Sequence, residues 1–185
     1  MKSPVNEPFS KDDLRRDYAA VRAWSEAFWL SFEPEEFFAP IGEAWSPADN
    51  VRHLLKSNGP VERGLKFPKL LVFLRFGVSL RKSRSYSELV ATYKEALGDG
   101  LTAGRFAARP LAVEEQTPEV QKRVVAELSA TLENLASAFG RWSDLSLDRL
   151  RFPHPGLGLL TVREMLFFTL YHNTHHVIGV AKRRG

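Results

Sequence analysis

The feature that most constrains the fold is an amphipathic pattern that begins after Thr117. A threonine at the N-cap position followed by Pro118 at the first helical position is a favoured helix start. The apolar residues of this pattern recur every three or four positions, at Val120, Val124, Leu128, Leu132, Leu135, Phe139 and Trp142. This spacing predicts a long α-helix with one apolar face, which must pack against other elements.

Two more helix starts precede this pattern. Ser10 and Asp13 have the spacing of a capping box, and apolar residues recur after them as far as Phe32. Residues 46–49, Ser-Pro-Ala-Asp, combine a serine N-cap, a proline at the first helical position and a carboxylate at the third. We expect this second helix to break by residues 58–60, Asn-Gly-Pro, because glycine and proline interrupt intrahelical hydrogen bonds.

A fourth long helix closes the chain. It follows a turn rich in proline and glycine over residues 152–158, which lacks the Asn-Gly or Asp-Gly signal of a tight β-hairpin. Thr161 and Glu164 form another capping box at its start. Residues 165–171, Met-Leu-Phe-Phe-Thr-Leu-Tyr, are apolar on almost every side of the helix, so we expect it to be central.

Residues 61–116 form a long connection between the second and third helices. A short helical pattern covers residues 86–97, and a basic run covers residues 81–84. Four long helices with one long connection predict an all-α four-helix bundle whose two middle helices run parallel. The chain has 185 residues, so we expect one domain over residues 1–185.

The composition excludes several kinds of site. The chain contains no cysteine, which rules out disulfides, thiolate zinc sites, iron–sulfur clusters and cysteine nucleophiles. Any metal must therefore be held by His, Asp or Glu. The N-terminus has no apolar segment typical of a secretory signal, and no apolar stretch is long enough to span a bilayer. We therefore expect a soluble cytoplasmic protein.

The five histidines suggest the chemistry; they are His53, His154, His172, His175 and His176. His172 and His176 lie one helical turn apart on one face, so both imidazoles can reach one ion. His53 lies on the inward face of the second helix and offers a third imidazole. Three imidazoles with an open position are typical of a catalytic zinc site, and nickel or iron suits the same ligands. Taken singly, these histidines also fit side chains satisfied by hydrogen bonds within the fold.

Other polar and aromatic residues near these histidines have simpler interpretations. His175 points away from the ion on the helical wheel and suits an outer or surface position. His154 lies in a proline-flanked turn and is interpreted as structural, with the mouth of the site as the alternative. Trp45 is interpreted as packing at the helix start. Asp49 is interpreted as a helix cap, with a contact to His53 as the alternative.

Three motifs in order resemble the DinB/YfiT-like superfamily. They are residues 45–49 (Trp-Ser-Pro-Ala-Asp) followed by His53, residues 154–158 (His-Pro-Gly-Leu-Gly), and residues 172–176 (His-Asn-Thr-His-His). The resemblance covers essentially the whole chain. It implies a four-helix bundle in up-down-down-up order, often a homodimer, that holds a divalent ion by three histidines.

By position in the family pattern, the metal ligands would be His53, His172 and His176. The resemblance also implies a small-molecule substrate, and some relatives are thiol transferases or isomerases that use low-molecular-weight thiols such as bacillithiol or mycothiol. The segment around residues 66–110 departs from the family pattern as a long insertion, so the resemblance does not identify the substrate.

Two classes of function follow from these observations. The first is a divalent-metal-dependent enzyme, with zinc or nickel as the ion, that acts as a thiol S-transferase or a hydrolase. The sequence lacks an HExxH motif and places no general base, which favours thiol transfer. The second is a non-catalytic protein: a metal-binding sensor or interaction protein, or a nucleic-acid or membrane binder that uses the basic residues 62–84. The apolar residues within that segment favour burial over an exposed binding face, so we expect no nucleic-acid partner.

Overall fold

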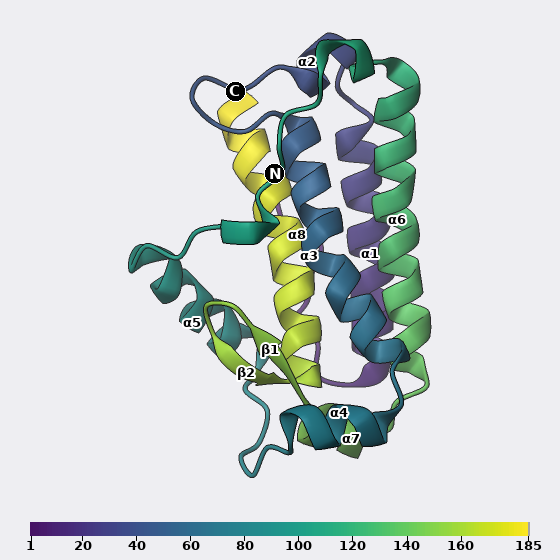
Figure 1. Ribbon diagram of the computed structural model, residues 1–185, viewed down its shortest axis with the longest axis vertical. Coiled ribbons are helices and arrows are strands. Elements are labelled where there is room, and N and C mark those ends of the chain that lie inside the picture. The colour runs from purple at the N-terminus through teal and green to yellow at the C-terminus, as the bar shows by residue number, and fades with distance from the viewer. Residues whose placement is uncertain (185) are drawn as a thin grey trace.

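Four long helices form the body of the protein in a computed structural model that describes residues 1–184. They are α1 (Lys11–Trp29), α3 (Pro47–Lys66), α6 (Pro118–Gly140) and α8 (Val162–Arg184). α1 and α8 run in one direction, and α3 and α6 run in the other (Figure 1). The predicted all-α bundle with up-down-down-up order is therefore confirmed, and its two middle helices are parallel.

The predicted capping residues lie at the start of each long helix. The hydroxyls of Ser10, Ser46, Thr117 and Thr161 each accept a hydrogen bond from the backbone N–H three residues later. These bonds satisfy donors that the first helical turn leaves without intrahelical partners. α1 ends one turn earlier than predicted, because the short helix α2 (Pro34–Phe38) begins there with its own extended N-cap residue, Glu33.

The prediction that the second helix breaks at residues 58–60 is wrong. α3 continues through Pro60 to Lys66. Pro60 has no N–H to donate, but the turn after it buries Val61 and Leu65 in the core. The indole of Trp142, which lies just beyond α6, donates a hydrogen bond of 3.0 Å to the Leu65 carbonyl. Burial and this bond offset the missing intrahelical hydrogen bond.

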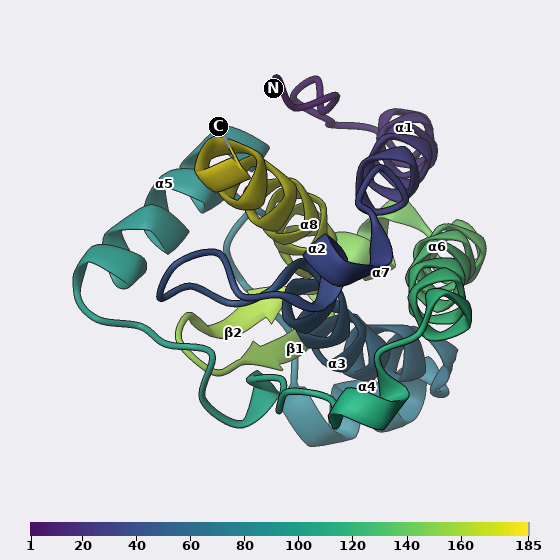
Figure 2. The ribbon, with the colours of Figure 1, turned by 90° about the horizontal axis from the view of Figure 1, so that it is seen from above.

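The long crossover between α3 and α6 contains structure of its own. It holds α4 (Lys69–Phe76), α5 (Tyr86–Gly98) and two single turns of 3₁₀-helix, η1 (Gly104–Phe106) and η2 (Val113–Glu115). α5 matches the helical pattern predicted over residues 86–97. Seen from above, α5 lies beside α8, on the side away from α6 (Figure 2). The crossover therefore adds a second layer to one side of the bundle.

The turn before α8 is part of a β-hairpin that we did not predict. After α7 (Asp144–Arg149), strands β1 (Arg151–His154) and β2 (Gly158–Thr161) pair antiparallel. The loop has three residues, 155–157, and β2 begins directly after it at Gly158, whose φ of +70° suits glycine. The Asn-Gly and Asp-Gly signals that we looked for are typical of two-residue loops, so they did not reveal this longer one. The hairpin packs against α3, where a Cβ on Gly64 would lie 2.9 Å from the Phe152 ring.

α8 is buried on nearly all sides, as its composition predicted. Every residue from Val162 to Leu170 is buried. The bundle covers one side of this helix, and α5 and the hairpin cover another. No helix within residues 1–184 is long and apolar enough to cross a membrane.

One buried carboxylate fastens the crossover to α8. Glu164 is fully buried and accepts hydrogen bonds of 2.7 Å from Arg81 Nη2 and 2.8 Å from the backbone N–H of Arg84. It also accepts one of 2.9 Å from the backbone N–H of Thr161. Burial raises the pKa of Glu164, but these hydrogen bonds outweigh it and hold the pKa at about 2. Part of the basic segment 62–84 thus serves the fold.

Replacing this carboxylate should weaken the fold. We expect Glu164→Gln to lower the free energy of unfolding near neutral pH by about 2–4 kcal/mol, because two arginines lose a buried partner. The contribution is complete above the ordinary pKa of 4.5 and is lost as the pH falls toward about 2. Urea unfolding at several pH values should show the two proteins converging in acid. Glu133→Gln, on the exposed face of α6, is the control and should change little.

Candidate functional site

Three histidines meet where α3 packs beside α8. His53 comes from α3, and His172 and His176 lie one turn apart on α8. The Nε2 atom of His172 lies 3.1 Å from Nε2 of His53 and 3.1 Å from Nε2 of His176. One nitrogen from each residue lies within 4.8 Å of the other two. The structure therefore brings together the three residues that the sequence singled out.

The Nδ1 nitrogen of each ring lies on the side away from the cluster and faces an oxygen atom. Nδ1 of His53 lies 2.9 Å from the Phe106 carbonyl, and Nδ1 of His176 lies 2.6 Å from Asn50 Oδ1. The Asn50 amide nitrogen donates to the Ser46 carbonyl at 2.8 Å, which leaves Oδ1 to accept. A carbonyl oxygen only accepts hydrogen bonds, so both Nδ1 atoms carry the proton. Nε2 of these two rings therefore presents a lone pair to His172.

This arrangement suits a divalent cation. A proton on Nε2 of His172 satisfies at best one of the two facing lone pairs well, whereas a cation between the rings satisfies all three nitrogens. Two imidazole nitrogens bound to one tetrahedral zinc ion at about 2.0–2.1 Å would lie about 3.3 Å apart, close to this separation. The carbonyl and amide acceptors on Nδ1 are the partners that metal-binding histidines ordinarily have. The residues present therefore fit a three-histidine metal site.

Burial keeps the three imidazoles neutral. It is the main cause that lowers the pKa of each of His53, His172 and His176 below the ordinary value. Repulsion from neighbouring imidazoles lowers the pKa of His172 and His176 further. Neutral imidazole is the form that binds metal, so the site is ready for an ion at neutral pH.

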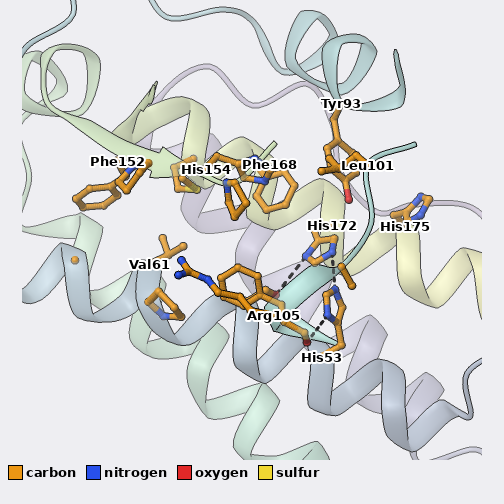
Figure 3. A pocket seen from close by; sticks show the side chains of 18 of the residues that line it. His53, Val61, Tyr93, Leu101, Arg105, Phe152, His154, Phe168, His172 and His175 are labelled. Carbon is orange, nitrogen blue, oxygen red and sulfur yellow. Dashed lines mark hydrogen bonds between the residues drawn. The ribbon is translucent and has the colours of Figure 1, made fainter. Parts of the chain in front are cut away.

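A cavity of about 1120 Å³ opens onto the three histidines. Figure 3 shows His53 and His172 near one end and Phe152 at the other. Its walls come from α3, α8, the crossover and β1, and no residue of α1 or α6 lines it. The cavity thus lies between the bundle and its second layer, outside the space enclosed by the four helices. No fourth His, Asp or Glu within residues 1–184 joins the cluster, so the cavity side of an ion would be open to a ligand.

The other predicted residues lie around this cavity. Asp49 caps α3 through Ser46, as interpreted from sequence. The Trp45 ring packs 5.2 Å from the His53 ring and lines the cavity, so it does more than start the helix. His154 is structural, because its Nδ1 accepts backbone hydrogen bonds within the hairpin loop, and its ring also lines the cavity. His175 is outside the triad and lines the cavity beside Tyr93.

Sequence reasoning missed three residues of the site. Asn50 orients His176, and its place one turn before His53 on a capped helix was the available signal. The carbonyl of Phe106 holds His53, but a backbone oxygen leaves no mark in a sequence. Tyr93 closes the cavity above His172, and its hydroxyl points toward that ring (Figure 3). Burial raises the pKa of Tyr93 to about 12, so this hydroxyl stays protonated.

Comparisons with known proteins agree with this architecture. The sequence pattern of the DinB superfamily matches residues 14–178. YfiT from Bacillus subtilis, described as "a probable metal-dependent hydrolase with an unusual four-helix bundle topology", has a TM-score of 0.61 and 14% identity, over 96% of this chain and 89% of that one. TT2238, described as a four-helix bundle protein, has a TM-score of 0.49 and 20% identity, over 94% of this chain and 99% of that one. No curated protein sequence matches the chain.

The buried imidazoles should make the metal-free protein sensitive to acid. Histidines in the unfolded chain protonate near 6.5, whereas the folded pKa of His172 lies well below 6.5. The free energy of unfolding should therefore fall as the pH drops below 6.5, by about 1.4 kcal/mol per pH unit for each such histidine. We expect His172→Phe, which can stack on Phe168 as His172 does, to show a shallower slope in urea unfolding with a chelator present. Equal slopes in the two proteins would contradict a neutral, buried His172.

Proposed function

Because the chain belongs to the DinB superfamily, we propose that it is a divalent-metal-dependent enzyme whose ion is held by His53, His172 and His176. One observation carries this proposal. The buried imidazoles of His53 and His172 and the half-buried one of His176 direct nitrogens at one point, and hydrogen bonds on the far side of His53 and His176 fix their lone pairs toward it. Such a cluster suits a divalent cation, and the adjoining cavity gives a substrate access to it.

The proposed ion is zinc or nickel, since neutral imidazoles suit both. When bound, such an ion would act as a Lewis acid that lowers the pKa of a thiol or a water molecule. The other requirements of the reaction would be met by the protein's own residues. The cavity removes the substrate from bulk water, Asn50 and the Phe106 carbonyl hold two ligands in place, and the Tyr93 hydroxyl can donate a hydrogen bond near His172.

The preferred reaction is transfer of a small thiol to an apolar molecule. No aspartate or glutamate within residues 1–184 lines the cavity, so no carboxylate is placed to act as a general base. A thiol ionises more readily than water and needs less help from a base. The thiol would be a diffusible cosubstrate, because the protein has no cysteine. Hydrolysis is the second candidate, supported by the description of YfiT as a probable metal-dependent hydrolase.

The first test is whether the protein holds a metal through these histidines. We expect elemental analysis of tag-free protein to find close to one divalent ion per chain, and His172→Ala to lose it. Chelation should lower the melting temperature of the parent and leave that of the variant unchanged, because only the parent gains stability from bound metal. His175→Ala is a matched control: it removes a histidine of the same helix outside the triad, and should keep the ion.

The outcomes separate the classes of function. A parent that is free of metal and cannot be reloaded would overturn the metalloenzyme proposal. Loaded protein that neither transfers small thiols to apolar electrophiles nor hydrolyses esters and amides would favour the non-catalytic alternative, a metal-binding sensor or interaction protein. The homodimer stays a prediction, which size-exclusion chromatography with light scattering would test.

A second variant tests the hydrogen bond that orients His176. We expect Asn50→Ala to weaken Zn²⁺ binding about 10- to 100-fold, because the ring loses the acceptor that sets its tautomer and direction. Competition with a chromophoric chelator measures this affinity. Asn134→Ala, on the exposed face of α6, should bind zinc like the parent. An unchanged affinity in Asn50→Ala would show that His176 is not a ligand or needs no orientation.

A further inference from the structure

The charged groups around the cavity are all positive. Four arginines line it: Arg63 of α3, Arg75 of α4, Arg105 of η1 and Arg183 of α8. No aspartate or glutamate within residues 1–184 shares the lining, and none of these arginines has a carboxylate within 4.0 Å in the described part of the chain. A concave site lined by charges of one sign concentrates the electrostatic potential and attracts the opposite charge.

The neutral polar groups of the cavity also offer hydrogens. Nδ1 of His154 accepts backbone hydrogen bonds from Gly156 at 3.2 Å and Leu157 at 3.0 Å, so its proton lies on Nε2. Burial lowers the pKa of His154 to about 4, which keeps this ring neutral. Its Nε2–H and the Tyr93 hydroxyl have no acceptor within residues 1–184. An acceptor group of a molecule in the cavity can therefore meet these two donors in addition to the arginines.

The rest of the lining is apolar. Aromatic and aliphatic side chains from every wall contribute, among them Phe67, Leu71, Phe76, Leu97, Phe152 and Phe168. A volume of about 1120 Å³ slightly exceeds the usual range of about 300–1,000 Å³ for small-molecule sites, so an extended apolar body fits within it. Figure 3 shows the Arg105 side chain extending from beside His53 toward Val61, along the apolar part of the cavity. Cationic and apolar surfaces thus lie next to each other in one site.

We propose that the cavity binds an amphiphilic organic anion, with its carboxylate or phosphate beside Arg75 and Arg105 and its apolar body extending toward the histidines. This inference rests on the proposed function, because it names the substrate class of the same site. An amine would meet four arginines that have no carboxylate partner within residues 1–184, and a neutral molecule would gain no contact with opposite charge. The anionic group therefore selects the ligand, and the apolar walls supply most of the contact area.

The test is displacement of a fluorescent amphiphile, 11-(dansylamino)undecanoate. The competitors share one chain length and differ in the head group: dodecanoate, dodecyl phosphate, dodecan-1-ol and dodecylammonium. We expect the probe to bind, and both anions to compete at least about tenfold better than the alcohol and the amine. The stronger of the two anions identifies the preferred head group. A probe that fails to bind, or competitors of equal strength, would overturn the proposal.

Arginine variants test where the anionic head group binds in the cavity. Arg75→Gln combined with Arg105→Gln should weaken dodecanoate about tenfold and leave dodecan-1-ol unchanged, because only the charged contact is lost. Arg123→Gln, exposed on α6 away from the cavity, is the matched control and should leave both affinities unchanged. Equal binding of dodecanoate by the parent and the double variant would place the anion elsewhere and overturn the proposal.

The same assay separates this inference from the metal site. His172→Ala should lose the ion and still prefer anions, because the arginines and apolar walls remain. Protein that holds one ion per chain but binds no amphiphile would overturn the ligand class and leave the metal proposal standing. Protein that prefers anions but cannot be loaded with metal would support the ligand class and overturn the metal proposal.

Discussion

The structure depends on one constraint: residues 165–171 of α8 are apolar on nearly every side, and a four-helix bundle covers only one side of them. The remaining surface of Val162–Leu170 would face water if the chain were a bare bundle. The crossover and the hairpin supply the second cover, and Glu164 fastens the crossover in place through Arg81 and Arg84. The long insertion is therefore a required layer of the fold.

This second layer also makes the site possible. Histidines exposed on an open α3–α8 surface would keep ordinary pKa values and would be hydrated. Beneath the crossover His53 and His172 become buried, and His53 depends on the crossover for its hydrogen bond to the Phe106 carbonyl. The element that completes the hydrophobic cover thus also fixes the tautomer of a candidate ligand. Folding of the crossover and preparation of the site are coupled through this bond.

The sequence predicted those parts of the protein that rest on local chemistry. Capping residues such as Ser46 and Thr117 act within one helical turn, so the sequence predicted the helix starts. The spacing of His172 and His176 is set by the helix itself, so the sequence also predicted that these two side chains lie together. The continuation of α3 through Pro60 was not, because distant partners decide it: Trp142 and the core around Leu65. The cavity could not be predicted from the sequence for the same reason. Its walls come from segments far apart in the chain, and packing alone brings them together.

The cavity is lined by two parts of the structure, the bundle and the crossover, which differ in how well they tolerate amino-acid substitutions. The histidine positions depend on α3 and α8, whose packing is fixed by the core, so alterations there would disturb the whole fold. Other parts of the cavity wall come from α4, α5 and η1, each of which packs mainly against one other element. Changes in the crossover can therefore alter the ligand while the three imidazoles keep their geometry. Phe106 is the exception, because it lines the cavity and its carbonyl also holds the candidate ligand His53 in place.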